Sequence, residues 1–208
     1  MKVVLYGASG MVGSRILTEL VSRGHQVTAV VRNPDKITAA GVRALRGDAT
    51  EVDSIAQTAK GADAAISAYA PPKGEEATLS AAVYALLDGL TEAGVNRLIV
   101  VGGAGTLEVA PGVALVDAPG FPDAYRDIAM AHRDVLPILK ESNRDWSYFC
   151  PAAFIQPGER TGKFRLGGTS FMVDEKGESR ISAEDYAVAL VDELENPQHI
   201  RQQFTAAY

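Results

Sequence analysis

The sequence predicts an α/β fold in which a doubly wound parallel sheet spans one domain, residues 1–208, with a small substrate-side extension at residues 152–181. Short apolar runs alternate with amphipathic stretches along the chain, which is typical of a parallel sheet covered by helices on both faces. A glycine-rich turn follows the first apolar run directly. A length of 208 residues suits one domain with a full core.

The first third of the chain alternates strands with helices. Residues 3–6 form a continuous apolar run, as expected for a strand that is buried on both faces. In the next stretch Val12, Ile16 and Leu20 recur at helical spacing, and Gly24 ends that helix. The expected strands are residues 3–6, 26–31, 42–45 and 64–68, and the expected helices are residues 11–23 and 51–60.

The remaining two thirds continue this alternation. Pro137 should kink the helix in which it lies, and Ser182 should cap the last helix, with Asp185 completing a capping box. We expect residues 106–122 to form a long loop over the carboxyl edge of the sheet. The expected helices are residues 75–93, 124–141 and 183–195, the expected strands are residues 97–101, 146–150 and 203–206, and strand-like pieces lie at residues 163–166 and 170–173.

Composition excludes several classes of function. The net charge of −6 is mild and no block of like charge occurs, which argues against nucleic acid or an anionic membrane as a partner. One cysteine, Cys150, and three scattered histidines give neither a disulfide nor a metal site. No segment approaches the roughly 20 apolar residues that span a bilayer, and no signal-peptide pattern opens the chain. We therefore expect a cytoplasmic protein.

The strongest motif is the run Gly-Ala-Ser-Gly-Met-Val-Gly at residues 7–13, which fits the pattern G-x-x-G-x-x-G. It follows the first strand directly and opens an amphipathic helix, which is the setting of a dinucleotide-binding turn. Gly7 permits the tight turn, Gly10 lets the backbone approach a pyrophosphate, and Gly13 lets helix and strand pack closely. The helix N-terminus attracts phosphate. The motif predicts a Rossmann-type fold that binds a nicotinamide dinucleotide.

The end of the second strand predicts a preference for NADP(H) over NAD(H). An acidic residue there would bind the ribose hydroxyls of NAD, but this chain has Arg32, with Lys36 close behind. Arg32 can hold a 2′-phosphate, or it is an ordinary solvated arginine. After the third strand, Asp48 can accept the exocyclic amine of adenine or cap the helix near Glu51, and Ala49 follows it.

The later strands should border the nicotinamide half of the cofactor, because ligands gather at the carboxyl ends of parallel strands. Tyr69, after the fourth strand, is either a wall for a ring or an ordinary packed aromatic residue. The small residues after Cys150 can let a nicotinamide ring lie flat. The predicted cofactor-binding residues are Gly7, Ser9, Gly10, Met11, Val12, Gly13, Arg32, Asp48, Ala49, Ser67, Ala68, Tyr69, Gly102, Gly103, Pro151, Ala153 and Phe154.

Taken together, these residues resemble the atypical short-chain dehydrogenase/reductase group, and within it the NADH-flavin reductases related to biliverdin-IXβ reductase and to the NmrA-like proteins. The resemblance spans nearly the whole chain. Its marks are residues 7–13, residues 30–34 (Val-Val-Arg-Asn-Pro), residues 145–147 (Asp-Trp-Ser) leading to Pro151, and residues 181–187 (Ile-Ser-Ala-Glu-Asp-Tyr-Ala). The resemblance implies a nicotinamide cofactor and a reductase activity.

The chain departs from the carbonyl-reducing members of the group that it resembles. Those members use a Tyr-x-x-x-Lys pair and a serine after the fifth strand. Here Gly102 and Gly103 follow that strand, Ala129 stands four residues after Tyr125, and His132 falls in the lysine position. The acid–base machinery for alcohol oxidation is therefore absent or rebuilt. Tyr125 and His132 remain the catalytic candidates.

Flavin reduction tolerates this absence, because hydride passes directly to the flavin ring and solvent supplies the proton. The sequence therefore favours an NADPH-dependent reductase of a flavin or a similar planar acceptor, without a metal. Two other functions stay open: an NmrA-like, NADP-sensing regulatory protein without turnover, and a carbonyl reductase in which Tyr125 or His132 donates the proton. A small planar molecule is the expected partner, and both a monomer and a homodimer are compatible with the sequence.

Overall fold

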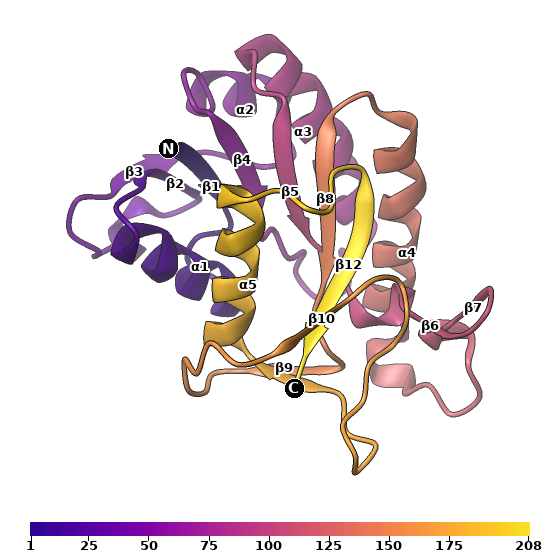
Figure 1. Cartoon of the computed structure of the whole chain (residues 1–208). Coiled ribbons are helices and arrows are strands. Elements are labelled where there is room, and N and C mark those ends of the chain that lie inside the picture. Colours follow the sequence, from indigo (N-terminus) through magenta and orange to yellow (C-terminus); the bar gives the residue numbers. More distant parts are fainter.

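The computed structural model describes residues 1–208, and an eight-stranded sheet forms its centre (Figure 1). Its strands are β1 (Lys2–Tyr6), β2 (Gln26–Val31), β3 (Arg43–Arg46), β4 (Ala64–Ser67), β5 (Arg97–Val101), β8 (Asp145–Cys150), β10 (Arg165–Gly167) and β12 (Gln202–Ala207). They lie in the order β10-β12-β8-β5-β4-β1-β2-β3. All neighbours are parallel except β10 and β12, which are antiparallel. The predicted Rossmann-type sheet is confirmed.

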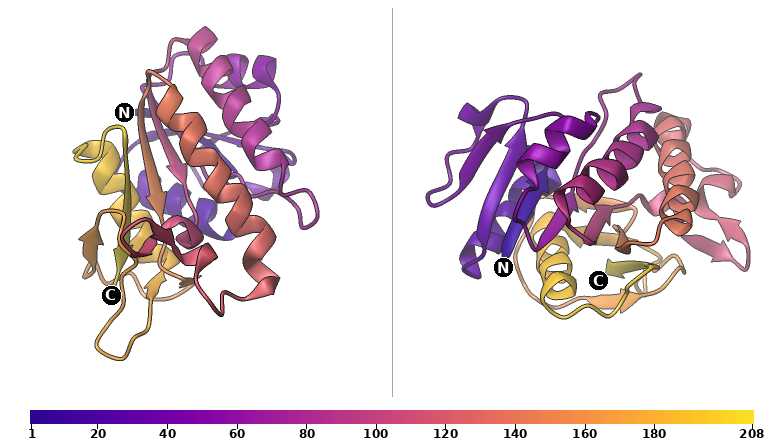
Figure 2. Two further views of the ribbon diagram at one scale, coloured as in Figure 1. Left: turned by 90° about the vertical axis from the view of Figure 1, so that its right-hand side faces the viewer. Right: turned by 90° about the horizontal axis from the view of Figure 1, so that it is seen from above.

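Helices cover both faces of the sheet (Figure 2). Helices α1 (Met11–Ser22) and α5 (Ala183–Glu195) pack on one face, and helices α2 (Val52–Thr58), α3 (Thr78–Ala93) and α4 (Arg126–Glu141) pack on the other. The two resulting cores hold 24 and 23 buried residues, so the faces are buried almost equally. This balance explains why the central strands are apolar without interruption.

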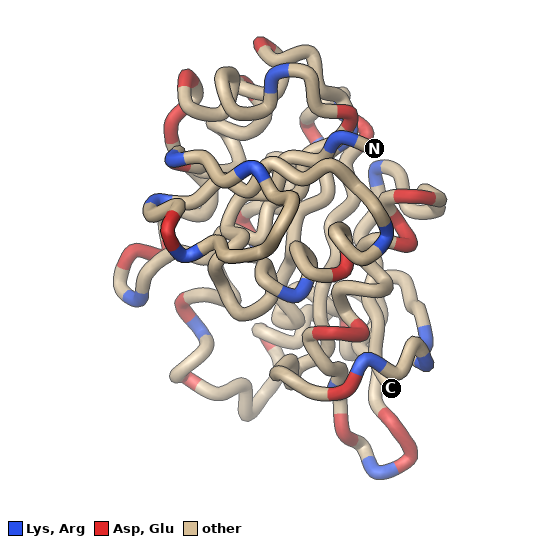
Figure 3. The backbone as a smooth tube through the Cα atoms, turned by 90° about the vertical axis from the view of Figure 1, so that its left-hand side faces the viewer, with Lys and Arg blue, Asp and Glu red and all other residues tan.

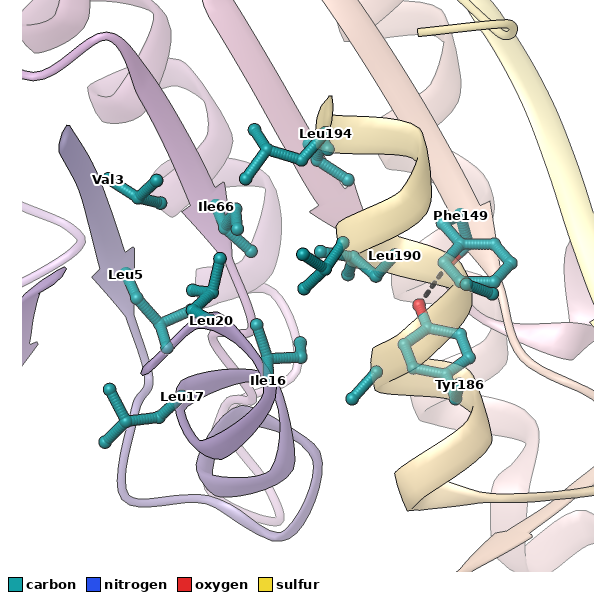
Figure 4. Packing of buried hydrophobic residues seen from close by; sticks show 14 of the residues in the cluster. Val3, Leu5, Ile16, Leu17, Leu20, Ile66, Phe149, Tyr186, Leu190 and Leu194 are labelled. Carbon is teal, nitrogen blue, oxygen red and sulfur yellow. Dashed lines mark hydrogen bonds between the residues drawn. The ribbon is translucent and has the colours of Figure 1, made fainter. Parts of the chain in front are cut away.

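The core under α1 and α5 is shown in Figure 4. Ile16 and Leu20 of α1 face Leu190 of α5 across the sheet surface. The ring of Tyr186 stacks on Phe149 of β8 with centroids 4.2 Å apart, and its hydroxyl donates to the Phe149 carbonyl oxygen at 2.7 Å. This contact fixes α5 against the strand whose carboxyl end leads toward the candidate site.

Most predicted elements are present with small shifts in their bounds. The bounds of β2, β5 and α5 are as predicted. Helix α3 begins at Thr78 rather than at residue 75, and α4 is preceded by a 3-10 turn over Asp123–Tyr125. Pro137 lies inside α4. Proline and glycine residues lie shortly before the first residues of α3 and α4, and they favour a turn there instead of an earlier start of the helix.

The segments over the carboxyl edge contain strands that the sequence did not predict. The expected loop at residues 106–122 holds a small hairpin of β6 (Glu108–Ala110) and β7 (Val113–Ala114). In the extension, β9 (Phe154–Gln156) pairs with β11 (Arg180–Ser182) in parallel. The predicted strand at 170–173 is wrong, since only Ser170 makes a bridge, to Glu108. The β9–β11 and Ser170–Glu108 pairings join segments that lie far apart in the chain, whereas β6 and β7 are joined by the short turn at Pro111 and Gly112.

The predicted capping box of α5 is only half formed. The Ser182 hydroxyl accepts from the Asp185 N–H at 3.0 Å, as predicted. The Asp185 carboxylate does not return to the Ser182 N–H, which instead donates to the Tyr208 hydroxyl at 3.2 Å. Asp185 accepts from Gly162 N–H at 2.7 Å and from the Thr161 hydroxyl at 2.5 Å. Its carboxylate therefore holds the extension rather than the helix end.

Two surface properties complete the description. None of the helices has the length and the apolar character that crossing a membrane requires. Figure 3 shows lysine and arginine interspersed with aspartate and glutamate over the backbone, which agrees with the modest net charge of −6.

Candidate functional site

A cleft of about 300 Å³ opens at the carboxyl ends of β1, β2, β3 and β4. The turns that follow these strands form its walls, at the edge where doubly wound sheets bind their ligands. Eight of the predicted cofactor residues line it: Gly7, Ser9, Gly10, Arg32, Asp48, Ala49, Ala68 and Tyr69. The structure thus gathers residues predicted for the adenosine and phosphate half, together with Ala68 and Tyr69, which the sequence assigned to the nicotinamide half.

The glycine turn has no room for side chains at two of its three glycines. Gly7 has φ of +78°, and a Cβ atom there would lie 2.3 Å from the Ala68 carbonyl oxygen. A Cβ atom at Gly13 would lie 2.1 Å from the Gly7 carbonyl oxygen, so α1 packs directly on the turn. Gly10 differs, because the nearest atom to its Cβ would be the Gly7 oxygen at 3.3 Å. A side chain at Gly10 would therefore project into the cleft.

The N-terminus of α1 offers free hydrogen-bond donors beside this turn. Gly10 precedes the helix in an extended conformation, and no side chain caps it. The N–H groups of Met11, Val12 and Gly13 have no partner in the protein. Free N–H groups and the helix dipole together favour an anion at this position. The cleft can therefore hold a phosphate by backbone contacts.

Arg32 and Asp48 face the cleft from the ends of β2 and β3. Arg32 is exposed, and no side chain or backbone oxygen binds its guanidinium. Asp48 accepts from the Thr50 N–H at 2.9 Å and from the Thr50 hydroxyl at 2.7 Å. These hydrogen bonds, with a smaller effect of Arg32, lower the pKa of Asp48 below its usual value. The capping alternative for Asp48 is wrong, because Glu51 occupies the N-cap of α2.

The turn after β4 forms the opposite wall. Ser67 is buried in the strand, whereas Ala68 and Tyr69 border the cleft. The Tyr69 hydroxyl lies 3.0 Å from the Thr78 hydroxyl at the start of α3. This bond orients the phenol ring along the wall, so Tyr69 is packed and also borders the cleft.

Apart from Ala68 and Tyr69, the residues predicted for the nicotinamide half lie outside this cleft, most of them around the ends of β5 and β8. Gly102 donates its N–H to the Phe149 carbonyl oxygen at 2.7 Å. A Cβ atom at Gly102 would lie 2.8 Å from the Cys150 Sγ, and one at Gly103 would lie 2.8 Å from the His132 ring. Pro151 is buried and Ala153 is exposed behind them. The two glycines therefore let the chain turn closely over β8 and α4.

His132 is a half-buried residue whose ring lies under Gly103. Burial lowers its pKa to about 4, and the ring is neutral at pH 7. The Tyr148 hydroxyl donates to the His132 carbonyl oxygen at 2.9 Å. The Tyr148 hydroxyl has a single proton, which this bond uses. In the contact of 3.0 Å between His132 Nδ1 and the Tyr148 oxygen, Nδ1 must therefore be the donor. The Nε2 atom of this tautomer carries no proton.

Tyr125 stands apart from these residues. It ends the 3-10 turn before α4 with 61% of its surface exposed, and its hydroxyl has no hydrogen-bond partner in the protein. Phe154 is also exposed, at 69%. The structure brings neither side chain into the cleft under the glycine turn.

Sequence reasoning missed four residues that shape the site. Thr50, Glu75 and Thr78 line the cleft, and Tyr148 fixes His132. Thr50 was open to prediction, because an Asp followed two residues later by Thr favours a local side-chain turn. The sequence gives no sign of a role for Tyr148 at the site, because a tyrosine within a buried strand has the pattern of an ordinary core residue.

The chain is similar over its full length to several solved structures. A “putative exported protein” from Burkholderia pseudomallei is 54% identical, with 100% of both chains covered and a TM-score of 0.93. A “putative epimerase” from Bacteroides thetaiotaomicron is 44% identical over 100% of this chain and 96% of its own, with a TM-score of 0.93. A “putative NADH-flavin reductase” from Streptococcus pneumoniae is 35% identical over 100% of this chain and 99% of its own, with a TM-score of 0.88.

A match to a protein family covers most of the chain, including nearly all residues that line the cleft. Residues 7–197 match the NAD(P)H-binding family, beginning at the first glycine of the turn. The match takes in the glycine turn and the strands from β2 to β11, whereas β1 and β12 lie just outside it. The chain therefore belongs to the NAD(P)H-binding family.

Proposed function

We propose that this protein is an NADPH-dependent reductase that transfers hydride to a flavin or a similar planar acceptor. The observation that carries the proposal is the glycine turn, where three unpartnered N–H groups open α1 beside a cleft lined by Arg32. A dinucleotide phosphate satisfies these donors. The similarity to a “putative NADH-flavin reductase” from Streptococcus pneumoniae supports the choice of acceptor.

The preference for NADP(H) rests on the free guanidinium of Arg32. No carboxylate pairs with it, so it is available for a 2′-phosphate. Asp48 keeps its charge because Thr50 binds it, and its second oxygen, Oδ2, is free to accept the exocyclic amine of adenine. These two side chains would hold the adenosine end, while the backbone of residues 7–13 would hold the pyrophosphate.

The choice of a planar acceptor rests on the lack of a proton donor. His132 is neutral with an unprotonated Nε2, and Tyr125 is exposed without a partner. NADPH held by the glycine turn and Arg32 would supply a hydride to the flavin N5 and would be released in its oxidised form. Water can supply the remaining proton, so the protein needs only to orient two rings.

An acceptor panel tests the proposal. Purified protein is mixed with NADPH or NADH and with riboflavin, FMN, a small quinone or a simple ketone, and the loss of reduced-cofactor absorbance is followed. We expect turnover with flavin or quinone, faster at low concentrations of NADPH than of NADH. Turnover of the ketone alone would contradict the proposal, and tight NADP binding without any turnover would favour the regulatory function.

A further inference from the structure

A second cavity lies beyond the carboxyl end of β8, on the outer face of the β9–β11 ribbon. Its volume is about 530 Å³, which falls in the range of small-molecule sites. Ile155 and Ile181 of the ribbon face the core. Because side chains alternate along a strand, Phe154 and its neighbour Arg180 face outward into the cavity.

Phe154 is a large apolar side chain that the fold presents to solvent. It keeps 69% of its surface exposed, although its backbone is held tightly. Its N–H donates to the Ser179 carbonyl oxygen at 3.0 Å, and the Ala153 N–H donates to the Ser179 hydroxyl at 3.1 Å. An exposed aromatic ring on a fixed strand is a preformed surface on which a planar molecule can stack.

The rim of the cavity is also fixed. Gly158 donates its N–H to Glu184 at 2.7 Å, and Ser182 donates its hydroxyl to the Glu159 carbonyl oxygen at 2.7 Å. The Tyr208 hydroxyl donates to Asp185 at 2.8 Å, which holds that ring as one wall. The cavity therefore exists without a ligand and does not need one to order it.

The charges at the cavity disfavour an anion. Its lining includes the exposed carboxylates of Glu159 and Glu178 and one cation, Arg180. The guanidinium of Arg180 is already paired with Glu178 at 3.3 Å and lies near Asp174 at 3.8 Å. It also sits 6.0 Å from the centre of the Tyr208 ring. A phosphate at this position would meet two carboxylates and no free cation.

We propose that this cavity receives the ring system of an uncharged planar acceptor, stacked on Phe154, and that Glu159 and Glu178 discriminate against acceptors that carry phosphate. The inference rests on the proposed function, and it names the acceptor class of that reaction. The volume of about 530 Å³ has room for the ring system of riboflavin, FMN or a quinone, and the carboxylates of Glu159 and Glu178 favour the uncharged acceptors over FMN. Phe154 and the two glutamates are specificity-determining residues, and none of them exchanges a proton.

Steady-state kinetics at saturating NADPH test the charge argument. We expect a lower KM for riboflavin than for FMN, and the KM for FMN alone should fall as salt is added, because salt screens exposed charges. The double variant Glu159→Gln, Glu178→Gln removes both carboxylates and leaves Arg180 with Asp174 alone as its acidic neighbour. It should lower the KM for FMN roughly threefold to tenfold and leave riboflavin unchanged. The control is Glu92→Gln, Glu141→Gln, which changes the net charge equally at exposed positions.

Direct binding separates this inference from the proposed function. Quenching of riboflavin fluorescence measures binding without turnover. Phe154→Ala should weaken that binding roughly tenfold, and Phe154→Leu should not restore it, because stacking needs an aromatic ring. Equal binding by wild type and Phe154→Ala, or equal KM values for FMN in wild type and the double glutamate variant, would overturn the inference. Riboflavin binding that depends on Phe154 but gives no reduction would instead overturn the proposed function alone.

Discussion

At the scale of single residues, the three glycines of the turn have different tasks. Gly7 and Gly13 face backbone atoms at 2.3 Å and 2.1 Å from a virtual Cβ, so they are requirements of the fold. Gly10 is less crowded, because a Cβ atom there would meet one close neighbour, the Gly7 carbonyl oxygen at 3.3 Å, and Gly10 borders the cleft. The same motif therefore contains two positions that fold the chain and one that leaves room for a ligand.

This difference predicts the behaviour of Gly10→Val. The new side chain should fill the space that the pyrophosphate enters, and dinucleotide binding should be abolished while the fold stays intact. Isothermal titration with NADPH measures the affinity, and circular dichroism checks the fold. Unchanged affinity in a folded variant would remove the phosphate-binding role of the turn.

Arg32 gives a second prediction at this scale. A charge-assisted hydrogen bond to phosphate contributes about 1.5–3 kcal/mol, so Arg32→Ala should weaken NADPH binding roughly tenfold to a hundredfold. NADH binding should barely change, because NADH has no 2′-phosphate. Arg43→Ala is the matched control, because Arg43 is also exposed but lies at the start of β3, away from the cleft at the carboxyl ends of the strands. Equal losses for both cofactors would show that Arg32 has another role.

At the scale of elements, helix α4 decides which chemistry is available. It supplies His132, whose Nδ1–H is used by Tyr148, and it follows Tyr125, which is exposed. Neither side chain is arranged as a proton donor. The helix packs against residues 103–106 through Ala129 and His132, so its contribution is to support the turn after β5.

We therefore expect flavin reduction to be insensitive to these side chains. A general acid contributes about a hundredfold to ten-thousandfold, whereas Tyr125→Phe and His132→Ala should each cost less than roughly tenfold in kcat with flavin. The measurement is steady-state turnover of riboflavin and of a small quinone, with NADPH binding measured in parallel. A loss of about a hundredfold in kcat with intact NADPH binding would make that residue the proton donor.

At the scale of the whole molecule, His132 also affects stability. Its folded pKa of about 4 lies below the unfolded value of about 6.5. Between these values the unfolded chain binds more protons, so the stability that is present above pH 6.5 falls as the pH is lowered toward 4. The free energy of unfolding should therefore fall by about 2 kcal/mol between pH 7 and pH 5.

Urea denaturation at both pH values measures this loss. His132→Gln provides the comparison, because glutamine does not titrate and the loss should shrink in that variant. Folding lowers the pKa of several carboxylates, among them Glu19 and Glu193. Their contribution to the free energy of unfolding is lost only below about pH 4 to 4.5, as the pH falls toward and through their folded pKa values. An equal drop in wild type and variant between pH 7 and pH 5 would assign the effect to other groups.

The sequence allowed the central sheet and its helices to be predicted because their signals are local. The apolar runs of β2 and β5, the caps of α5 and the glycine turn each lie within a few neighbouring residues. The β6–β7 hairpin was open to prediction, because the dipeptide Pro111-Gly112 marks a turn between its two short strands. The β9–β11 ribbon could not be predicted, because its two strands lie far apart in the chain and no local pattern shows their pairing. For the same reason Asp185 was predicted to complete a cap, whereas its carboxylate holds Thr161 and Gly162.

The position of β12 has a consequence for how the chain is made. Residues 202–207 lie between β8 and β10 in the sheet, and the Phe204 ring stacks on Phe149 at 4.2 Å. While a ribosome is still producing them, β8 presents an unpaired edge and β10 has no neighbour. Exposed strand edges invite pairing with other chains. Nascent chains that stall before residue 202 should therefore need a chaperone, whereas chains released after residue 207 can close the sheet themselves.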